Sequence, residues 1–248
     1  MSNWKDQIQI ELIPELCAGS DLSIANVARV SFNKWKEEKD DGDDALVRYL
    51  ANHQHSSPFR HTSIGVRCTA PIHVARQLVK HQAGLSWNEV SRRYVKEPVE
   101  LFNQEFRAAP EGSIKQGSAG IIMPEDVPEV RLITGTDTTE DIDIFSIQES
   151  LLGWYDKCIA EGIAPETVRG YMPLNMQTSW VWTGNLMAFH HMYKLRIDAH
   201  AQKEVQVFAE KAAEVMKPLF PVAWDALSGV DAWRREQMLK DVLEGKDG

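Results

Sequence analysis

A stretch rich in proline and glycine, from residue 98 to residue 145, constrains this chain more than any other feature. Proline fixes φ and lacks a backbone N–H, and glycine weakens helices and strands, so no long regular element can run through such a stretch. Its breakers are Pro98, Pro110, Gly112, Gly117, Gly120, Pro124, Pro128 and Gly135. We therefore predict a single domain over residues 1–248, with an irregular excursion or a small hairpin at about 98–145.

Regular hydrophobic patterns lie on both sides of this excursion. Residues 63–69 and 178–182 alternate in polarity, as half-buried strands do. Helical spacing and capping residues predict helices over residues 45–52, 71–81, 186–196 and 198–217, a helix capped at Ser146, and a short helix opened by Pro165. This order of elements predicts an α+β fold, in which helices pack on a mostly antiparallel sheet.

The composition excludes several classes of protein. The 248 residues include 27 Lys and Arg against 36 Asp and Glu, which gives a net charge of −9, and 43% of the residues are hydrophobic. A disordered chain would have fewer apolar residues, and a nucleic-acid-binding surface is basic rather than acidic. We therefore expect a globular protein with no nucleic acid partner.

The cysteines and the apolar residues are distributed as in a cytoplasmic protein. Cys17, Cys68 and Cys158 are odd in number and far apart, so we interpret them as reduced thiols. Residues 1–13 lack the apolar core of a signal peptide, and no stretch reaches the roughly 18 apolar residues of a membrane span. We expect neither export nor a membrane partner.

The segment of residues 76–96 is basic although the chain is acidic. It holds five Lys and Arg residues and one carboxylate, Glu89. On the predicted helix, Gln77, Lys80 and His81 stand at i, i+3 and i+4 and therefore share one face. The donors that follow are Ser91, Arg92 and Arg93. Guanidinium and hydroxyl donors suit a phosphate, so the segment predicts a site for a phosphorylated small molecule such as a nucleotide, and a solvated basic face is the alternative.

Arginines and histidines outside this segment leave further alternatives open. Arg169 and Arg196 stand in apolar surroundings, where an arginine forms either a structural ion pair or a ligand contact. Paired histidines such as His190 and His191 would allow a metal site, but the chain has no H-E-x-x-H motif and no cysteine pair. We therefore expect no metal.

Four separated blocks of this sequence resemble the flavin-dependent thymidylate synthases. Residues 75–82 (Ala-Arg-Gln-Leu-Val-Lys-His-Gln) and 88–94 (Asn-Glu-Val-Ser-Arg-Arg-Tyr) are similar to the family signature of Arg-His-Arg, seven residues and Ser. Residues 55–61 resemble the family's His-x-x-Pro-Phe-x-His element. Blocks within residues 169–185 and 195–202 follow in the family's order, and the likeness extends over about residues 20–225.

The resemblance implies both an activity and an assembly. Members of the family catalyse the reductive methylation of dUMP to dTMP, with methylenetetrahydrofolate as the carbon donor and NADPH-reduced FAD as the hydride source. The family fold is an α+β homotetramer with active sites at subunit interfaces. Two alternatives stay open, namely a non-catalytic nucleotide-binding relative that has lost flavin, and a metal-dependent nucleotide hydrolase.

The resemblance also implies which residues form the site. The positions that bind dUMP are matched by Gln77, Lys80, Glu89, Ser91, Arg92, Arg93, Arg169 and Arg196. The positions that bind flavin are matched by His55, Ser57, Lys80, His81, Gln82, Glu89, Asn185, Met187 and His191. Arg196 matches the catalytic arginine on the uracil edge, where a permanently charged guanidinium polarises the ring.

Several of the flavin positions depart from the family pattern. Residues 80–82 read Lys-His-Gln in place of Arg-His-Arg, which removes two guanidinium groups. Met187 and His191 stand where the family has arginine and asparagine, and eight residues rather than seven separate the Lys-His-Gln triplet from Ser91. The resemblance is therefore closer over the dUMP positions than over the flavin positions.

Overall fold

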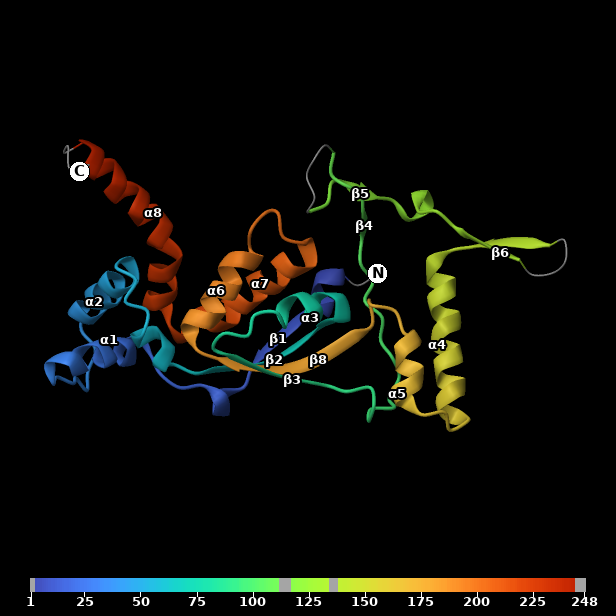
Figure 1. Ribbon diagram of the computed structural model, residues 1–248, viewed down its shortest axis with the longest axis horizontal. Coiled ribbons are helices and arrows are strands. Elements are labelled where there is room, and N and C mark those ends of the chain that lie inside the picture. Colours follow the sequence, from blue (N-terminus) through green and yellow to red (C-terminus); the bar gives the residue numbers. More distant parts are fainter. Residues whose placement is uncertain (1–2, 112–116, 134–137, 244–248) are drawn as a thin grey trace. The chain divides into compact units, whose positions relative to one another are not determined.

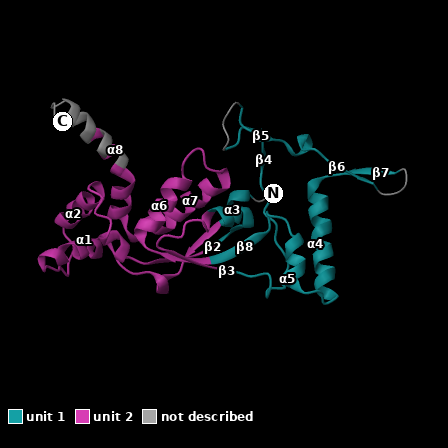
Figure 2. Cartoon of the chain, viewed as in Figure 1, with its two compact units in different colours: residues 1–8, 69–77, 89–180 teal, residues 9–68, 78–88, 181–248 magenta. Residues whose placement is uncertain are grey.

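The computed structural model describes residues 3–111, 117–133 and 138–243, and the chain divides into two compact units. Unit 1 comprises residues 1–8, 69–77 and 89–180, and unit 2 comprises residues 9–68, 78–88 and 181–248 (Figure 2). The chain passes repeatedly from one unit to the other, so neither unit is a continuous segment of sequence. The single domain expected from the sequence stays a prediction.

A four-stranded sheet contains the two strands that the alternating patterns predict. Its order is β1 (Gln9–Leu12), β2 (Ile64–Pro71), β8 (Gln177–Gly184) and β3 (Leu85–Glu89), labelled in Figure 1. Along β8, Thr178, Trp180 and Trp182 are buried and the residues between them are partly exposed, as predicted. Alternating burial of this kind fixes which face of the strand packs inward. The fold is α+β, and the predicted fold class is confirmed.

Unit 2 contains most of the long helices. They are α1 (Asp21–Arg29), α2 (Asp41–Asn52), α6 (Leu186–Arg196), α7 (Lys203–Met216) and α8 (Pro221–Leu243). The ring of Trp182 contacts those of Phe189 and Phe208 at centroid distances of 5.3 and 6.3 Å, and these rings anchor α6 and α7 to β8. The helix expected over residues 198–217 begins only at residue 203, because Asp198 first caps a turn by accepting from the His200 backbone N–H at 2.8 Å.

A buried carboxylate joins α1 to α2. Asp43 is fully buried, and it pairs with Arg29 of α1 and with Lys36 at 3.5 Å. Its side chain also accepts from the backbone N–H of Asp40, at 2.7 Å, which completes a capping box at the start of α2. Asp43 therefore fixes the start of α2 against α1.

Unit 1 has a smaller core around α4 (Ile144–Ala160) and α5 (Pro165–Val168). The buried residues of this core are Val99, Tyr155, Cys158, Val168 and Met176. The predicted helix near Ser146 is present, but it begins at residue 144, because the Asp143 carboxylate caps it by accepting from the backbone N–H groups of Phe145 and Ser146.

The breaker-rich stretch contains short antiparallel strand pairs. Strand β4 (Phe106–Arg107) pairs with β5 (Ile121–Ile122), and β6 (Val130–Ile133) pairs with β7 (Thr139–Ile142). Residues 112–116 and 134–137 of the predicted excursion lie outside the described residues.

Helix α3 (Ile72–Leu78) is shorter than predicted, and one expectation based on it is wrong. Pro71 is the last residue of β2, and the helix ends at residue 78, so Lys80 and His81 lie in the following turn and share no helical face with Gln77. The turn is needed because the chain must reach β3 by residue 85. Gly84 makes this possible with a left-handed φ of 75° that favours glycine.

The remaining regular elements are short 3-10 helices. They are η1 (Trp4–Gln7), η2 (Pro14–Leu16), η3 (Val30–Phe32), η4 (Pro58–His61), η5 (Pro124–Asp126), η6 (Arg169–Tyr171) and η7 (Lys217–Leu219). Among the described residues, no helix combines the length and the apolar character that crossing a membrane requires.

Candidate active site

A cavity of about 470 Å³ in unit 1 brings together three of the predicted dUMP residues. Glu89, Arg92 and Arg169 all line it, although they come from β3, from the loop after β3 and from η6. Hydroxyl groups line it as well, contributed by Thr69, Thr178 and Ser179. A second carboxylate, that of Glu100, also lines the cavity. Two guanidinium groups, two carboxylates and several hydroxyls suit a phosphorylated ligand that also carries hydrogen-bonding ring atoms.

The sheet holds Glu89 in position at this cavity. The hydroxyl of Thr178 on β8 donates to Glu89 Oε1 at 2.8 Å, and the backbone N–H of Val90 donates to the Ser179 carbonyl at 2.9 Å. The Thr69 and Ser179 hydroxyls are hydrogen-bonded to each other at 2.8 Å. The cavity wall is thus formed by strand residues whose positions are set by sheet pairing.

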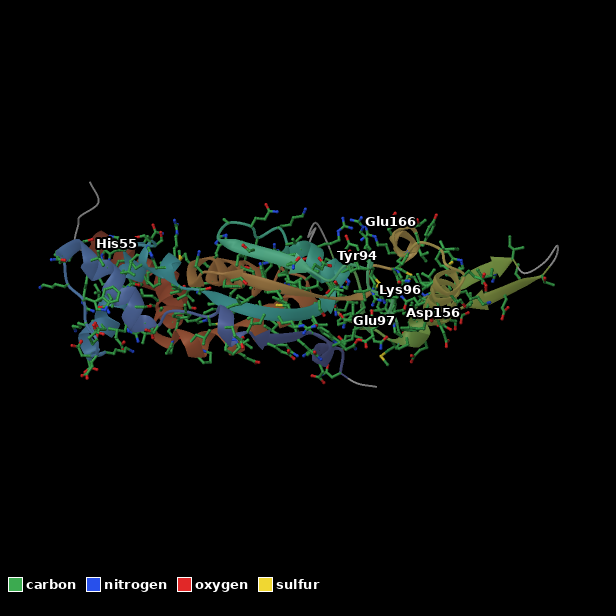
Figure 3. All side chains as sticks on the ribbon, turned by 90° about the horizontal axis from the view of Figure 1, so that it is seen from below. His55, Tyr94, Lys96, Glu97, Asp156 and Glu166 are labelled. Carbon is green, nitrogen blue, oxygen red and sulfur yellow. The ribbon has the colours of Figure 1, made fainter. Side chains whose placement is uncertain are left out.

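The loop after β3 carries Ser91, Arg92 and Arg93, and their side chains have different partners. The guanidinium of Arg92 donates to the carbonyls of Glu97 and Pro98, which closes the loop on itself. Arg93 pairs with Glu166 at 3.6 Å and lies 5.5 Å from the ring of Tyr94, and Figure 3 labels both partners. The Ser91 hydroxyl accepts from the Arg93 backbone N–H at 3.4 Å.

The other predicted dUMP residues differ in how they are placed. Arg169 is exposed at the start of η6, and its guanidinium makes no ion pair or hydrogen bond with the described residues, 3–111, 117–133 and 138–243. Gln77 is half-buried near the end of α3 and is not among the residues lining the cavity. Lys80 is exposed in the turn after α3 and belongs to unit 2.

In unit 2, one helix carries several of the predicted flavin residues. Asn185 caps α6 by accepting from the Ala188 backbone N–H at 2.9 Å, as the sequence predicts. Met187 and His191 follow on the first turns of the helix, and Arg196 is its last residue. The turn after α3 is attached to this helix, because the Asn185 backbone N–H donates to the Gly84 carbonyl at 3.3 Å.

Arg196 and His81 are in direct contact. The Nε–H of Arg196 donates to His81 Nε2 at 2.9 Å, and the rings of His81 and His191 lie 6.3 Å apart. Burial, followed by the positive charge of Arg196 and by His191, lowers the pKa of His81 to about 4. Burial also lowers the pKa of Arg196, which nevertheless stays charged at any working pH. His81 is therefore neutral at pH 7, which lets it accept the Arg196 proton.

A second cavity, of about 430 Å³, lies in unit 2 beside α6. Met187 and His191 line it, together with Gln54 and Ser56, which flank the predicted flavin residue His55. Its apolar lining residues are Leu50, Ala51, Phe59, Leu227 and Val230. Arg60 and Lys194 add two positive charges, and no carboxylate is found among the described residues that line the cavity. An apolar cavity with cations on its lining fits a flat aromatic cofactor that carries phosphates.

The remaining predicted flavin residues are exposed in loops of unit 2. His55 follows α2, where its ring lies edge-on to that of Tyr49 at 6.0 Å. Ser57 precedes η4, and Gln82 lies in the turn before β3. None of these three residues is among the lining of the second cavity. Glu89, which was assigned to both ligands, lies in unit 1.

Comparison with known proteins identifies the family. A sequence model described as "Thymidylate synthase complementing protein" matches residues 11–222. The chain belongs to the flavin-dependent thymidylate synthase family. It is 34% identical over 216 residues to the flavin-dependent thymidylate synthase of Wolbachia pipientis wMel, which covers 84% of this chain and 70% of that relative. The enzyme of that name from Thermotoga neapolitana is also 34% identical, over 88% of this chain and 89% of its own.

A solved structure has the same fold as this member of the family. It is the UMP/dUMP methylase PolB from Streptomyces cacaoi, crystallised with 5-Br dUMP. The TM-score is 0.62 and the sequence identity 25%, over 90% of this chain and 95% of that one. The likeness extends across nearly the whole of both chains.

Sequence reasoning missed several polar residues of this flavin-dependent thymidylate synthase. Arg60 occupies a variable position of the residue 55–61 motif, and Lys194 lies between two assigned positions of α6, so neither attracted an assignment. Thr178 was interpreted only as a strand residue, although its hydroxyl holds Glu89. A helical count from Met187 to His191 and Lys194 would have placed the lysine on the same face.

Proposed function

We propose that this protein catalyses the reductive methylation of dUMP to dTMP. Methylenetetrahydrofolate would supply the carbon, which replaces the proton on C5 of the uracil ring. NADPH and a proton would supply the two hydrogens that complete the methyl group and regenerate tetrahydrofolate. The observation that carries the proposal is the unit 1 cavity, where Glu89, Arg92 and Arg169 of a family member line one space.

The residues of unit 1 would bind the nucleotide and orient it. Arg169, whose guanidinium has no hydrogen-bond or ion-pair partner among the described residues, would bind the phosphate together with Ser91 and Arg93. Arg92 lines the same space while its own loop holds it in place. Glu89 would accept a hydrogen bond from the nucleotide, and Gln77 and Lys80 would complete the set.

Arg196 would act on the base. Its guanidinium stabilises the negative charge that develops on a uracil oxygen, which polarises the ring toward the incoming carbon. The bound, reduced FAD would supply the hydride, and the protein supplies position and charge.

The residues around the second cavity fit a flavin. Arg60 and Lys194 would contact the phosphates, and the apolar lining would contact the ring system. The predicted residues that would complete the flavin site are His55, Ser57, Lys80, His81, Gln82, Glu89, Asn185, Met187 and His191. No observation on the described residues favours either alternative, the relative that has lost flavin or the metal-dependent hydrolase. Those residues include no group of three or more His, Cys, Asp and Glu arranged to hold a metal ion.

We extend the proposal to the assembly and the location. The family resemblance supports a homotetramer whose active sites are completed by neighbouring subunits, and light scattering on the pure protein would test it. The three free cysteines, Cys17, Cys68 and Cys158, support a reducing, cytoplasmic location.

The experiment that tests the activity is tritium release from [5-³H]dUMP with FAD, NADPH and methylenetetrahydrofolate. We expect release that depends on each of the three additions, and no release from any complete mixture would refute the proposal.

FAD binding is measured separately by flavin fluorescence. Arg60→Ala should weaken it by about tenfold or more, the scale of a hydrogen bond to a charged group. Arg67→Ala is the matched control, because Arg67 is an exposed arginine of the same unit that does not line the cavity.

A further inference from the structure

We propose that His81 is a positioning residue for Arg196, because its imidazole holds Nε of the guanidinium and thereby directs both Nη groups at the nucleotide. This role rests on the proposed function, in which Arg196 acts on the uracil ring. It differs from the role that the family resemblance implies for His81, which is a contact to flavin.

The contact with His81 restricts a side chain that would otherwise have many conformations. Arg196 is the last residue of α6, and its side chain has four rotatable bonds before the guanidinium. Fixing such a side chain costs rotamer entropy. The hydrogen bond to His81 Nε2 at 2.9 Å restricts the guanidinium before any ligand binds.

The backbone around His81 is itself fixed in several ways. The His81 N–H donates to the Leu78 carbonyl at 2.9 Å, which closes the turn directly after α3. The far side of the turn is attached to α6 through the hydrogen bond between Asn185 and Gly84 at 3.3 Å. A Cβ at Gly84 would lie 2.7 Å from the Asn185 amide nitrogen, so the turn and the start of α6 are in close contact. His81 and Arg196 are thus carried by two segments that are joined to each other.

The protonation state of His81 allows only one role in this contact. Its pKa of about 4, lowered first by burial and then by Arg196 and His191, leaves the ring neutral near pH 7. A guanidinium has no acceptor, so His81 must present the lone pair of Nε2 and carry its proton on Nδ1. A protonated imidazole could not accept this bond, and an acid side chain here would neutralise the charge that Arg196 offers to the base.

The contact also leaves both Nη groups of Arg196 available for a ligand. The contact engages Nε alone, and neither Nη group has a hydrogen-bond partner within the described part of the chain. The two Nη groups present parallel N–H donors, which suit a planar acceptor such as a uracil oxygen and its neighbouring ring atom. A guanidinium already held in this orientation loses less freedom when the nucleotide binds.

NMR on the ligand-free protein tests the contact without requiring activity. With ¹⁵N-labelled arginine and histidine, a coupling across the hydrogen bond should join Arg196 Nε to His81 Nε2, and Arg196→Lys assigns the arginine signal. His81→Gln should keep the arginine N–H protected, because its amide oxygen reaches the place of Nε2. His81→Asn should lose the protection, because its side chain is shorter. His200→Gln is the matched control, since His200 contacts Asp198 rather than Arg196 and should leave the signal unchanged.

Kinetics then test the consequence for the reaction. We expect His81→Asn to lower kcat by roughly 10- to 100-fold, the scale of a misplaced catalytic group, with a smaller change in the KM for dUMP. His81→Gln should recover at least tenfold of that loss. An absent coupling in the wild-type protein, or equal kcat for the Gln and Asn variants, overturns the positioning role. A wild-type protein that shows the coupling but releases no tritium refutes the proposed function and leaves the contact standing.

Discussion

The two units hold their candidate ligand-binding residues in different ways. In unit 1, Ser91, Arg93 and Arg169 lie in a loop and a short 3-10 helix, and Arg169 has no hydrogen-bond or ion-pair partner among the described residues. In unit 2, Arg196 and His191 are carried by α6, and Arg196 is already bonded to His81. Unit 1 thus offers adaptable donors, and unit 2 offers a donor fixed by its scaffold.

This difference separates two tasks of an enzyme that binds a nucleotide and then activates it. Adaptable cations in loops can adjust to a phosphate, whose three oxygens accept from many directions. Stabilising the charge that develops on one ring oxygen requires a donor whose direction is set beforehand. We therefore expect substitutions in unit 1 to change mainly the affinity for dUMP, and substitutions around Arg196 to change mainly kcat.

The largest effect is expected for Arg196→Ala. Removing a charged donor from the base should lower kcat for dTMP formation by roughly 10²- to 10³-fold, the scale for losing one donor to a developing oxyanion. Thermal unfolding should be unchanged, because Arg196 is partly exposed at the end of α6. Single-turnover kinetics with saturating dUMP measure this directly. Turnover close to that of the wild type would remove Arg196 from the mechanism.

A second prediction separates the stability of unit 2 from nucleotide binding in unit 1. Asp43→Ala should lower the free energy of unfolding by about 3 kcal/mol, because it leaves Arg29 without its buried partner. Urea denaturation measures the loss. Asp44→Ala is the matched control, because its carboxylate is partly exposed and pairs with the exposed Lys39, so less than about 1 kcal/mol is expected.

The pH dependence of this loss has a definite sign. Burial alone raises the pKa of Asp43, but the hydrogen bond from the Asp40 backbone and the charges of Arg29 and Lys36 outweigh it, so the pKa is lowered. A lowered carboxyl pKa stabilises the folded state above the unfolded pKa of about 3.9, and the benefit disappears as the pH falls through the folded value. The difference between wild type and Asp43→Ala should therefore shrink below about pH 4. A difference that stays constant down to pH 2 would contradict the assignment.

The sequence predicted best those elements whose local signals agree with their packing. Strand β8 alternates because one face meets the core, and α6 begins at Asn185 because that side chain caps it. Prediction failed for α3, where the helical pattern continues to His81 but the chain turns early to enter β3. The competing cause is tertiary, since only the sheet order requires that turn, and no local spacing reveals it.

The residues of the candidate site could be predicted where family motifs contain them. They could not be predicted where only the tertiary fold brings them together. Glu89, Arg92 and Arg169 were assigned from motifs, and they line one cavity although they are up to 80 residues apart. The contact between His81 and Arg196 spans 115 residues and has no signal in either segment. In the sequence, Arg60 and Lys194 have no feature that distinguishes them from other exposed cations. Only the structure shows that they line one cavity.

A third prediction concerns the loop of unit 1. Ser91→Ala should weaken dUMP binding by roughly 1 to 3 kcal/mol, because it removes a hydrogen bond to a charged phosphate. Titration calorimetry with dUMP checks it, with Ser150→Ala on α4 as the control for a hydroxyl lost elsewhere in the unit, where it donates to the Ser146 carbonyl at 2.9 Å. If the comparison between the units holds, kcat at saturating dUMP should change less than threefold. An unchanged affinity would remove Ser91 from the phosphate site.

The smallest effect is expected for substitutions of Asn185. They test whether this residue only caps α6 or also contacts the flavin. Asn185→Ala removes the cap of α6 and should cost about 1 kcal/mol of unfolding free energy, whereas Asn185→Asp keeps an acceptor for the Ala188 N–H and should cost little. Flavin fluorescence then divides the two roles. If the amide N–H₂ of Asn185 donates to the flavin, the aspartate variant binds FAD more weakly despite its intact cap. Equal affinity for FAD in the aspartate variant and the wild type would mean that Asn185 contributes to the site only by capping α6. The cap would then be part of the scaffold that holds Arg196 and His191 in place.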